Sequence, residues 1–396
     1  MVNHQTVRRL KIAASICLAL YCIVVLFNVM TKNKQWDYKT YYYAAKTYFS
    51  GDNPYPIEAL SRAAGENIVF PFVYPPPTLF FFKPFLLFDY RTSYFVFFGV
   101  KLVALALLIF IWRKFFVSDP AYGIALFLLC ALAYRETIIR DLYAGNVSCF
   151  EQLFVWSAVA CFLKKNAVPF CLLIVISAFF KITSILFLLL PLIDKDKGSI
   201  RAVIFAAAAF ASVNLISYIQ EPALFESFLN NLFSLESQGS LSISLEERGN
   251  INPASLALIK DAINVFSSAT SINLPFLDLV LYSIFIVLLL ISVYNNVKNF
   301  DFRTNRLEFV ILCFFLYALI LPRFKDYSYM LLIVPTLYVI RNGFASSTAR
   351  LAAMLAICIT FLRYQQLLTA LTLFIFYLKY LRTFAVKQLG VSGQIN

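Results

Sequence analysis

The chain has 396 residues, of which 61% are hydrophobic and only 14% are charged. A soluble domain has about 45–50% apolar and about 25% charged residues. The composition therefore excludes a cytosolic enzyme, a nucleic-acid-binding module and a disordered chain, and it predicts an all-α polytopic membrane protein. In such a protein the formal net charge of +13 reports first on membrane topology.

In chain order, the first apolar run covers residues 12–30, and it follows Arg8, Arg9 and Lys11. It predicts an uncleaved first membrane helix, since no small-x-small cleavage site follows it. A long polar segment, 31–75, comes next. Residues 76–90 are apolar, but three prolines interrupt them, so we expect this stretch to dip into the membrane without crossing it independently.

The later apolar runs predict the remaining membrane helices, and a second polar segment, 220–275, divides them. They lie at 92–112, 120–137, 147–163, 167–180, 182–193, 202–219, 276–297, 307–321, 327–341, 349–362 and 365–382. The runs at 167–180 and 182–193 are each short for a span, so they could be two short helices or one long tilted helix.

Charge sets the expected sidedness. Counting 12–30 but not 76–90 gives about twelve crossings with both termini in the cytoplasm. The predicted cytoplasmic segments then hold basic pairs such as Arg113-Lys114 and Lys164-Lys165, whereas segment 220–275 is acidic. This separation follows the positive-inside rule. We therefore expect both long polar segments on the outer face of the cytoplasmic (inner) membrane. Segment 220–275 would be a loop that covers a cavity and selects the acceptor, with a flexible part at 234–253.

The reactive side chains narrow the chemistry. The single histidine, His4, lies in the polar N-terminal tail, so histidine acid–base catalysis and histidine-ligated metals are not expected. The eight cysteines form no CxxC pair and lie mostly in apolar runs, which indicates packing. No GxxxxGK or GxGxxG motif is present to cradle a soluble nucleotide. An activated donor should therefore arrive through the lipid.

Asp37 is the strongest candidate for catalysis. It stands about one helical turn beyond the first membrane helix, where a carboxylate meets both water and lipid headgroups. It could take the proton from a sugar hydroxyl that attacks a lipid-linked donor, which is general-base catalysis. The alternative is a helix-end acid or an N-cap for a helix at 38–49.

Short motifs follow one another along the chain in a definite order. Asp37 opens D-x-x-x-Y-Y-x-A-A, and it is followed by G-x-x-P-Y at 51–55, F-V-Y-P-P-P at 72–77, R-D-L-Y-A-G-N at 140–146 with Glu151, F-K-I-T at 180–183, and P-R-F-K-D-Y-S-Y at 322–329. In this order the motifs resemble glycosyltransferase family 87, the bacterial polyprenyl-phosphate-mannose-dependent α-mannosyltransferases of the GT-C superfamily. Asn146 stands where that family more often has glutamine, and Ser184 where proline is usual.

The resemblance implies a single GT-C-type domain over 1–396, a bundle of about 12 transmembrane helices with two long outer loops. It implies an inverting transfer of a sugar, most simply mannose, from a polyprenyl-phosphate donor to a glycolipid or glycan hydroxyl outside the cytoplasm. By position Asp37 would be the base, Tyr41 and Tyr42 would wall the sugar pocket, and Tyr74 would belong to its floor. Membrane lipids would be further partners, and neither a metal nor a cofactor is expected.

A leaving polyprenyl phosphate needs a fixed cation near the bilayer surface. The candidates are Lys181, Arg323, Lys325 and Arg140. Lys181 could instead be a snorkelling lysine at a helix end. Arg323 and Lys325 could be a solvated loop pair, and Arg140 could pair with neighbouring acids. Asn146, Glu151, Asp326 and Tyr327 complete the expected pocket. Glu151 could instead stabilise a helix N-terminus.

A transporter or flippase of lipid-linked saccharides is the competing function, because such proteins also have about twelve helices. A transporter should show internal repeat symmetry and charges near the membrane midplane. The sequence shows no convincing repeat, and its polar residues concentrate in the outer segments, which favours the enzyme.

Overall fold

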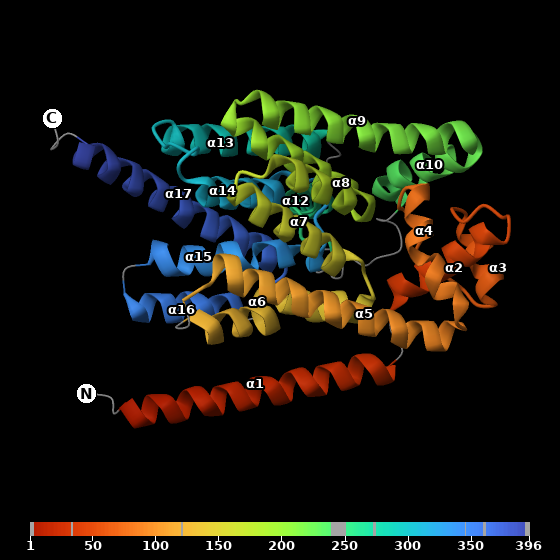
Figure 1. Ribbon diagram of the computed structural model, residues 1–396, viewed down its shortest axis with the longest axis horizontal. Helices are drawn as coiled ribbons and strands as arrows, with labels where there is room; N and C mark the ends of the chain where they lie inside the picture. Colours follow the sequence, from red (N-terminus) through yellow and green to blue (C-terminus); the bar gives the residue numbers. More distant parts are fainter. Residues whose placement is uncertain are drawn as a thin grey trace. The chain divides into compact units, whose positions relative to one another are not determined.

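The computed structural model describes residues 4–32, 35–119, 122–238, 251–271, 275–344, 346–358 and 362–392. Within these ranges every regular element is a helix, which confirms the expected all-α class (Figure 1). The chain divides into two compact units. Unit 1 comprises Met1–Ile124 and Ile138–Ser242, and unit 2 comprises Ala125–Thr137 and Ile243–Asn396. Each unit is described by itself.

Unit 1 holds segment 31–75, which is expected to face outward and is called the first outer segment, and most of the apolar helices that follow it. Its α-helices are α1 (His4–Lys32), α2 (Trp36–Phe49), α3 (Ile57–Ala64), α4 (Leu79–Phe82), α5 (Tyr90–Ile111), α7 (Ser148–Leu163), α8 (Ala167–Phe180), α9 (Lys197–Gln220) and α10 (Pro222–Gln238). The other helical segments are η1 (Pro76–Thr78), η2 (Lys83–Leu87), η3 (Trp112–Phe116) and the longer η5 (Ile182–Asp194). α7 packs against α8, and α8 packs against α9; α2, α3 and α4 gather near the beginning of α5 (Figure 1).

Two interrupted apolar runs lie in unit 1. Residues 76–90 form three short helical pieces, η1, α4 and η2, and whether they enter the membrane stays a prediction. The stretch 167–193 forms two helical segments, because Lys181 is extended (φ −153°, ψ 105°) between α8 and η5. The first outer segment contains two short helices, α2 and α3; α2 covers the helix considered at 38–49.

Helix α2 is buried along most of its length even though its sequence is polar. Its tyrosines form an aromatic core with residues of α5 and the segment before it; Tyr38 stacks on Phe97 with ring centroids 4.1 Å apart. A buried phenol needs a hydrogen-bond partner. Tyr38 pairs with Ser93, and the Tyr42 hydroxyl donates to the Phe88 carbonyl at 2.9 Å. This packing fixes the helix that carries Asp37.

Unit 2 contains the C-terminal helices α12 (Ser255–Thr270), α13 (Leu277–Val297), α14 (Arg306–Ile320), η6 (Asp326–Leu332), α15 (Ile333–Gly343), α16 (Ser347–Cys358) and α17 (Gln365–Ser392). α17 packs against α13, α14 and α15. α6 (Gly123–Ala144) is shared between the units, and Tyr134, Arg135 and Glu136 interrupt its helical geometry with positive φ values. Within unit 2 the Tyr134 hydroxyl lies 2.6 Å from that of Thr336.

Segment 220–275, expected as a loop with a flexible part at 234–253, is helical over much of what the structure describes. Most of 234–253 lies outside the described ranges. α10 and α12 occupy much of this segment, and residues 239–250 and 272–274 lie outside the described ranges. α10 is held in unit 1 because Asn231 donates to the carbonyls of Tyr55 and Phe72, at 2.7 and 3.1 Å. Leu224 and Phe228, one helical turn apart on α10, are both buried, so this helix has a short apolar stripe of helical spacing.

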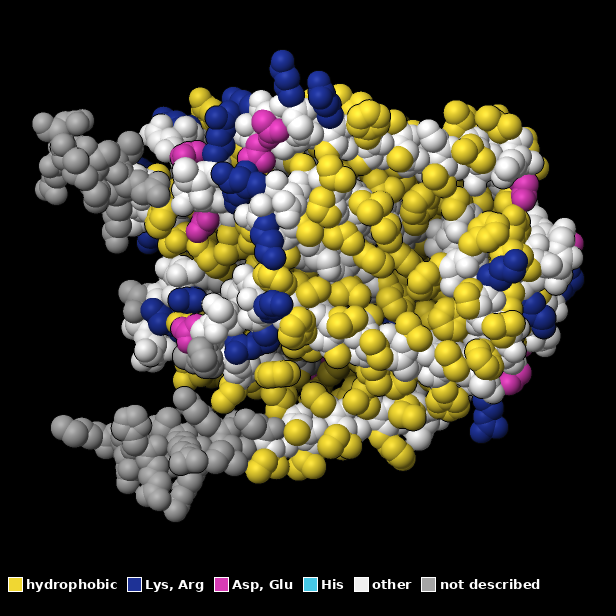
Figure 2. Space-filling view, viewed as in Figure 1, with side chains coloured by type: hydrophobic (Ala, Val, Ile, Leu, Met, Phe, Trp, Pro, Cys, Tyr) yellow, Lys and Arg dark blue, Asp and Glu magenta, His cyan; other side chains and the backbone are white. Residues whose placement is uncertain are grey.

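Four described helical stretches are long and apolar enough to cross a membrane: Tyr90–Phe116, Lys197–Gln220, Leu277–Val297 and Gln365–Val386; a fifth is added if the bent pair α1 and α2 is one span. α7, α8, η5 and α16 are apolar but have only 12 to 16 residues. α9 and α13 expose most of their apolar side chains, and hydrophobic side chains cover much of the face in Figure 2. Such a surface suits lipid, and the chain is a polytopic membrane protein. The number of crossings and their sidedness stay predictions.

Candidate active site

Asp37 lies in the first turn of α2 and is almost completely buried, with 7% of its surface exposed. Its Oδ2 atom accepts a hydrogen bond of 2.7 Å from the side-chain amide of Asn146. The structure therefore brings together two residues that the sequence analysis assigned to one pocket, although they are 109 positions apart.

The orientation of the Asn146 amide follows from its other contacts. Its Oδ1 atom accepts from both the backbone N–H and the hydroxyl of Ser148, at 3.0 and 2.9 Å. Its Nδ2 group donates to Asp37 and, at 3.0 Å, to the Tyr41 hydroxyl. An amide has one acceptor oxygen and one donor nitrogen, so this arrangement directs N–H toward the carboxylate.

Gly145 sets the approach of this turn to α2. It ends α6 with φ +67°, a left-handed conformation that favours glycine. A Cβ atom at this position would lie 2.8 Å from the Cβ of Gln35 and 2.9 Å from that of Tyr38. Position 145 therefore requires glycine for two reasons: the left-handed backbone conformation and the lack of space for a Cβ atom.

Two tyrosines extend the network from Asn146. The Tyr41 and Tyr74 hydroxyls are 2.8 Å apart, and the Tyr55 hydroxyl donates to the Tyr74 carbonyl at 2.8 Å. Burial and the negative charge of Asp37 raise the pKa of Tyr74 well above its usual value. Its phenol is thus neutral at physiological pH and can donate or accept a hydrogen bond beside the carboxylate.

A buried ion pair that the sequence analysis did not predict contacts the backbone of Asn146. Lys101 of α5 is completely buried, and its Nζ atom lies 2.8 Å from Oδ2 of Asp141. The same ammonium donates to the carbonyls of Asp141 and Asn146, both at 2.7 Å. All three contacts hold the turn that carries Asn146. A lone lysine inside the apolar run 92–112 is a signal that could have found this pair.

Glu151 and Lys181 form a second charged group. Glu151, in the first turn of α7, is buried and accepts from the Ser184 hydroxyl at 2.8 Å. Its Oε2 atom lies 3.7 Å from Nζ of Lys181, whose side chain is 24% exposed. The charge of Glu151 also raises the pKa of Tyr74, so this pair lies within electrostatic range of the Asp37 network.

The remaining expected site residues have other surroundings. Tyr42 points its hydroxyl to the Phe88 carbonyl within the aromatic core, and Arg140 is half-buried on α6, next to Asp141. The other four, Arg323, Lys325, Asp326 and Tyr327, belong to unit 2. There Nζ of Lys325 lies 5.5 Å from the centre of the Tyr327 ring, and Asp326 accepts from the Tyr327 N–H at 2.9 Å.

Unit 1 thus joins one buried acid, one directing amide and two phenols, with a partly exposed lysine nearby. Such a set can accept a proton from a hydroxyl and neutralise a leaving anion. Among the residues that the structure describes, no group of three or more His, Cys, Asp or Glu side chains could hold a metal ion. That the reaction needs no metal stays a prediction.

Comparison with known proteins assigns the sequence to a family. Neither the curated proteins nor the solved structures contain a match to the chain. The model of glycosyltransferase family 87 matches residues 72–322, which is more than half of the chain. The matched region begins after Asp37 and includes Tyr74, Lys101, Asn146 and Lys181. The chain is an integral-membrane glycosyltransferase that belongs to glycosyltransferase family 87.

Proposed function

We propose that the protein transfers a sugar, mannose, from a polyprenyl-phosphate donor to an acceptor hydroxyl at the outer face of the cytoplasmic membrane. The reaction is a single displacement that inverts the anomeric carbon. The acceptor is a glycolipid or a glycan. The observation that carries this proposal is the buried Asp37 carboxylate, held by the Asn146 amide beside two tyrosine hydroxyls.

In the proposed reaction the acceptor oxygen attacks the anomeric carbon while its proton passes to Asp37. The bond between the anomeric carbon and the phosphate oxygen breaks, and polyprenyl phosphate leaves with the electron pair. Asn146 orients the carboxylate through Oδ2. Lys181, which Glu151 holds at 3.7 Å, stabilises the negative charge that develops on the phosphate.

Substituting Asp37→Asn tests the base. The amide keeps the shape of the carboxylate but cannot accept the proton, so we expect the transfer rate to fall about 10²- to 10⁴-fold. The measurement is transfer from radiolabelled polyprenyl-phosphate-mannose into membrane extract, with the product identified by mass spectrometry. Glu66→Gln, an exposed acid of the same outer segment, is the control and should keep its rate. Undiminished transfer by a folded Asp37→Asn enzyme would remove Asp37 from the base role.

A further inference from the structure

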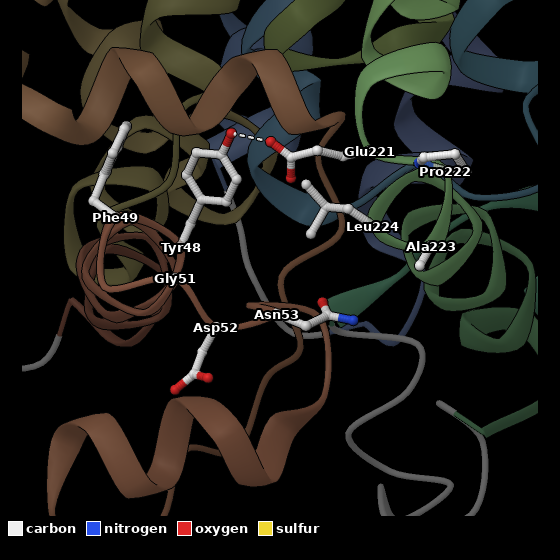
Figure 3. Close-up of a pocket in the computed structure, with 9 residues that line it drawn as sticks. All are labelled: Tyr48, Phe49, Gly51, Asp52, Asn53, Glu221, Pro222, Ala223 and Leu224. Carbon is white, nitrogen blue, oxygen red and sulfur yellow. Dashed lines mark hydrogen bonds between the residues drawn. The ribbon is translucent and has the colours of Figure 1, made fainter.

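A cavity lies at the C-terminal end of α2, away from Asp37. Its volume is about 650 Å³, a size typical of small-molecule sites. Its walls come from the end of α2, the connection after it, and the start of α10, all within unit 1. The lining residues are Tyr48, Phe49, Gly51, Asp52, Asn53, Glu221, Pro222, Ala223 and Leu224 (Figure 3).

The cavity offers acceptors of hydrogen bonds and aromatic rings. Tyr48, Glu221 and Leu224 stand on one side of the hollow, and Asp52 and Asn53 on the other (Figure 3). The Tyr48 hydroxyl donates to Oε1 of Glu221 at 2.8 Å. Carboxylate and amide oxygens accept hydrogen bonds from hydroxyls, and ring faces contact the apolar side of a sugar. This combination of groups suits a saccharide.

The negative charge of the lining argues against the binding of a donor phosphate in this cavity. Two carboxylates, Asp52 and Glu221, line it, and its nine lining residues include neither lysine nor arginine. A polyprenyl phosphate would meet like charge there, which disfavours binding. A neutral sugar with many hydroxyls meets no such penalty.

The walls of the cavity are fastened to each other. The Asn53 amide donates to the Ser227 hydroxyl at 2.9 Å, and the Tyr55 ring contacts that of Phe228. Asn231 donates to two backbone carbonyls of the first outer segment. The site is therefore formed before a ligand arrives, which reduces the entropic cost of binding.

Helix α2 links the cavity to the candidate base. Asp37 and Tyr48 are eleven positions apart on α2, which corresponds to about 16 Å along the helix axis. One sugar ring cannot extend over that distance. An acceptor whose reacting hydroxyl meets Asp37 would therefore place a more distant sugar unit in the cavity.

We propose that this cavity is a second saccharide subsite, which binds a neutral sugar unit of the acceptor remote from the unit that is glycosylated. The inference rests on the proposed function, because it gives the acceptor more than one sugar. It predicts that a longer acceptor is used better than a shorter one, since the added unit reaches the cavity.

Acceptors of increasing length test the subsite. Octyl α-glycosides of mannose, mannobiose and mannotriose are compared as acceptors at a fixed concentration of polyprenyl-phosphate-mannose. For the wild-type protein we expect kcat/KM to rise at least tenfold from the shortest to the longest. Ala223→Trp fills the cavity from an exposed position, and Tyr48→Phe with Glu221→Leu removes the hydroxyl and the carboxylate from one of its walls. Both should abolish most of the gain while the KM for the donor stays unchanged.

Glu58→Gln, which neutralises an exposed acid of α3 outside the cavity, should keep the full gain. If Ala223→Trp keeps it too, the subsite is refuted while the transferase stands. If the wild-type protein transfers no sugar at all, the proposed function fails, and the cavity is then tested by saturation-transfer NMR with the trimannoside alone. Binding by the wild type that Ala223→Trp abolishes supports the subsite. The subsite is overturned if the wild type does not bind the trimannoside, or if Ala223→Trp binds it as well as the wild type.

Discussion

At the scale of single residues, the Asp37 network depends on phenols that stay protonated. Burial and the charge of Asp37 raise the pKa of Tyr74, so its hydroxyl should remain neutral beyond pH 10. Tyr74→Phe removes the partner of Tyr41, and we expect kcat to fall about 2- to 10-fold. Tyr43→Phe, on α2 with Tyr41, is the control. The pH profiles of the transfer rate, measured from pH 6 to pH 10.5, should have the same shape in the wild type and in Tyr74→Phe. A fall near pH 10 that only the wild type shows would contradict the raised pKa of Tyr74.

Lys101 controls the position of Asn146 from a buried site. Lys101→Met leaves the Asp141 carboxylate without its cation, and breaking a buried pair in this way costs about 3–5 kcal/mol. We expect a large drop in the melting temperature of the detergent-solubilised protein, measured by scanning fluorimetry. Lys101→Met with Asp141→Asn should recover part of the loss, whereas exposed Lys46→Met should have little effect. A single variant as stable as wild type would show that the pair is dispensable.

At the scale of elements, the turn between α6 and α7 must approach the start of α2 closely. Gly145→Ala adds a Cβ that meets two other Cβ atoms at 2.8 and 2.9 Å, and a Cβ cannot rotate away as a longer side chain can. The two backbones must separate, so Asn146 should withdraw from Asp37. We expect a lower melting temperature and at least a tenfold lower transfer rate.

Gly65→Ala is the matched control for that prediction. Gly65 also has a left-handed conformation, with φ +70°, but a Cβ atom added there would meet no other atom within 4 Å. It should show the conformational cost alone, about 1–2 kcal/mol, with an unchanged transfer rate per folded molecule. Equal losses of activity in both variants would argue against a special role for the approach at Gly145.

The sequence identified elements better than contacts. Apolar runs located α5, α9 and α13 because a lipid-facing helix is apolar around most of its circumference. The helices of segment 220–275 were not expected, because its acidic and polar residues were given more weight than the apolar positions that recur at helical spacing in α10 and α12. Asp37 and Asn146 were each found by motif. Their contact could not be derived, since it depends on a turn that Lys101 holds through backbone carbonyls, which carry no sequence signal.

At the scale of the whole molecule, the proposed chemistry requires the first outer segment and α10 to face the outside. Glu226→Cys, exposed on α10, should react with a membrane-impermeant maleimide in intact cells when the native cysteines are replaced. Lys195→Cys, exposed after η5, should react only after the membrane is permeabilised. The reverse labelling pattern would invert the predicted topology and exclude an outer-face active site.

The long sequence separation between Asp37 and Asn146 has a consequence for biosynthesis. The ribosome releases the acid early, and the amide that orients it follows 109 positions later. In the proposed mechanism, a nascent chain that has inserted only its opening helices therefore lacks the amide that orients the base. The proposal thus requires the α6–α7 turn to dock on α2 before transfer begins.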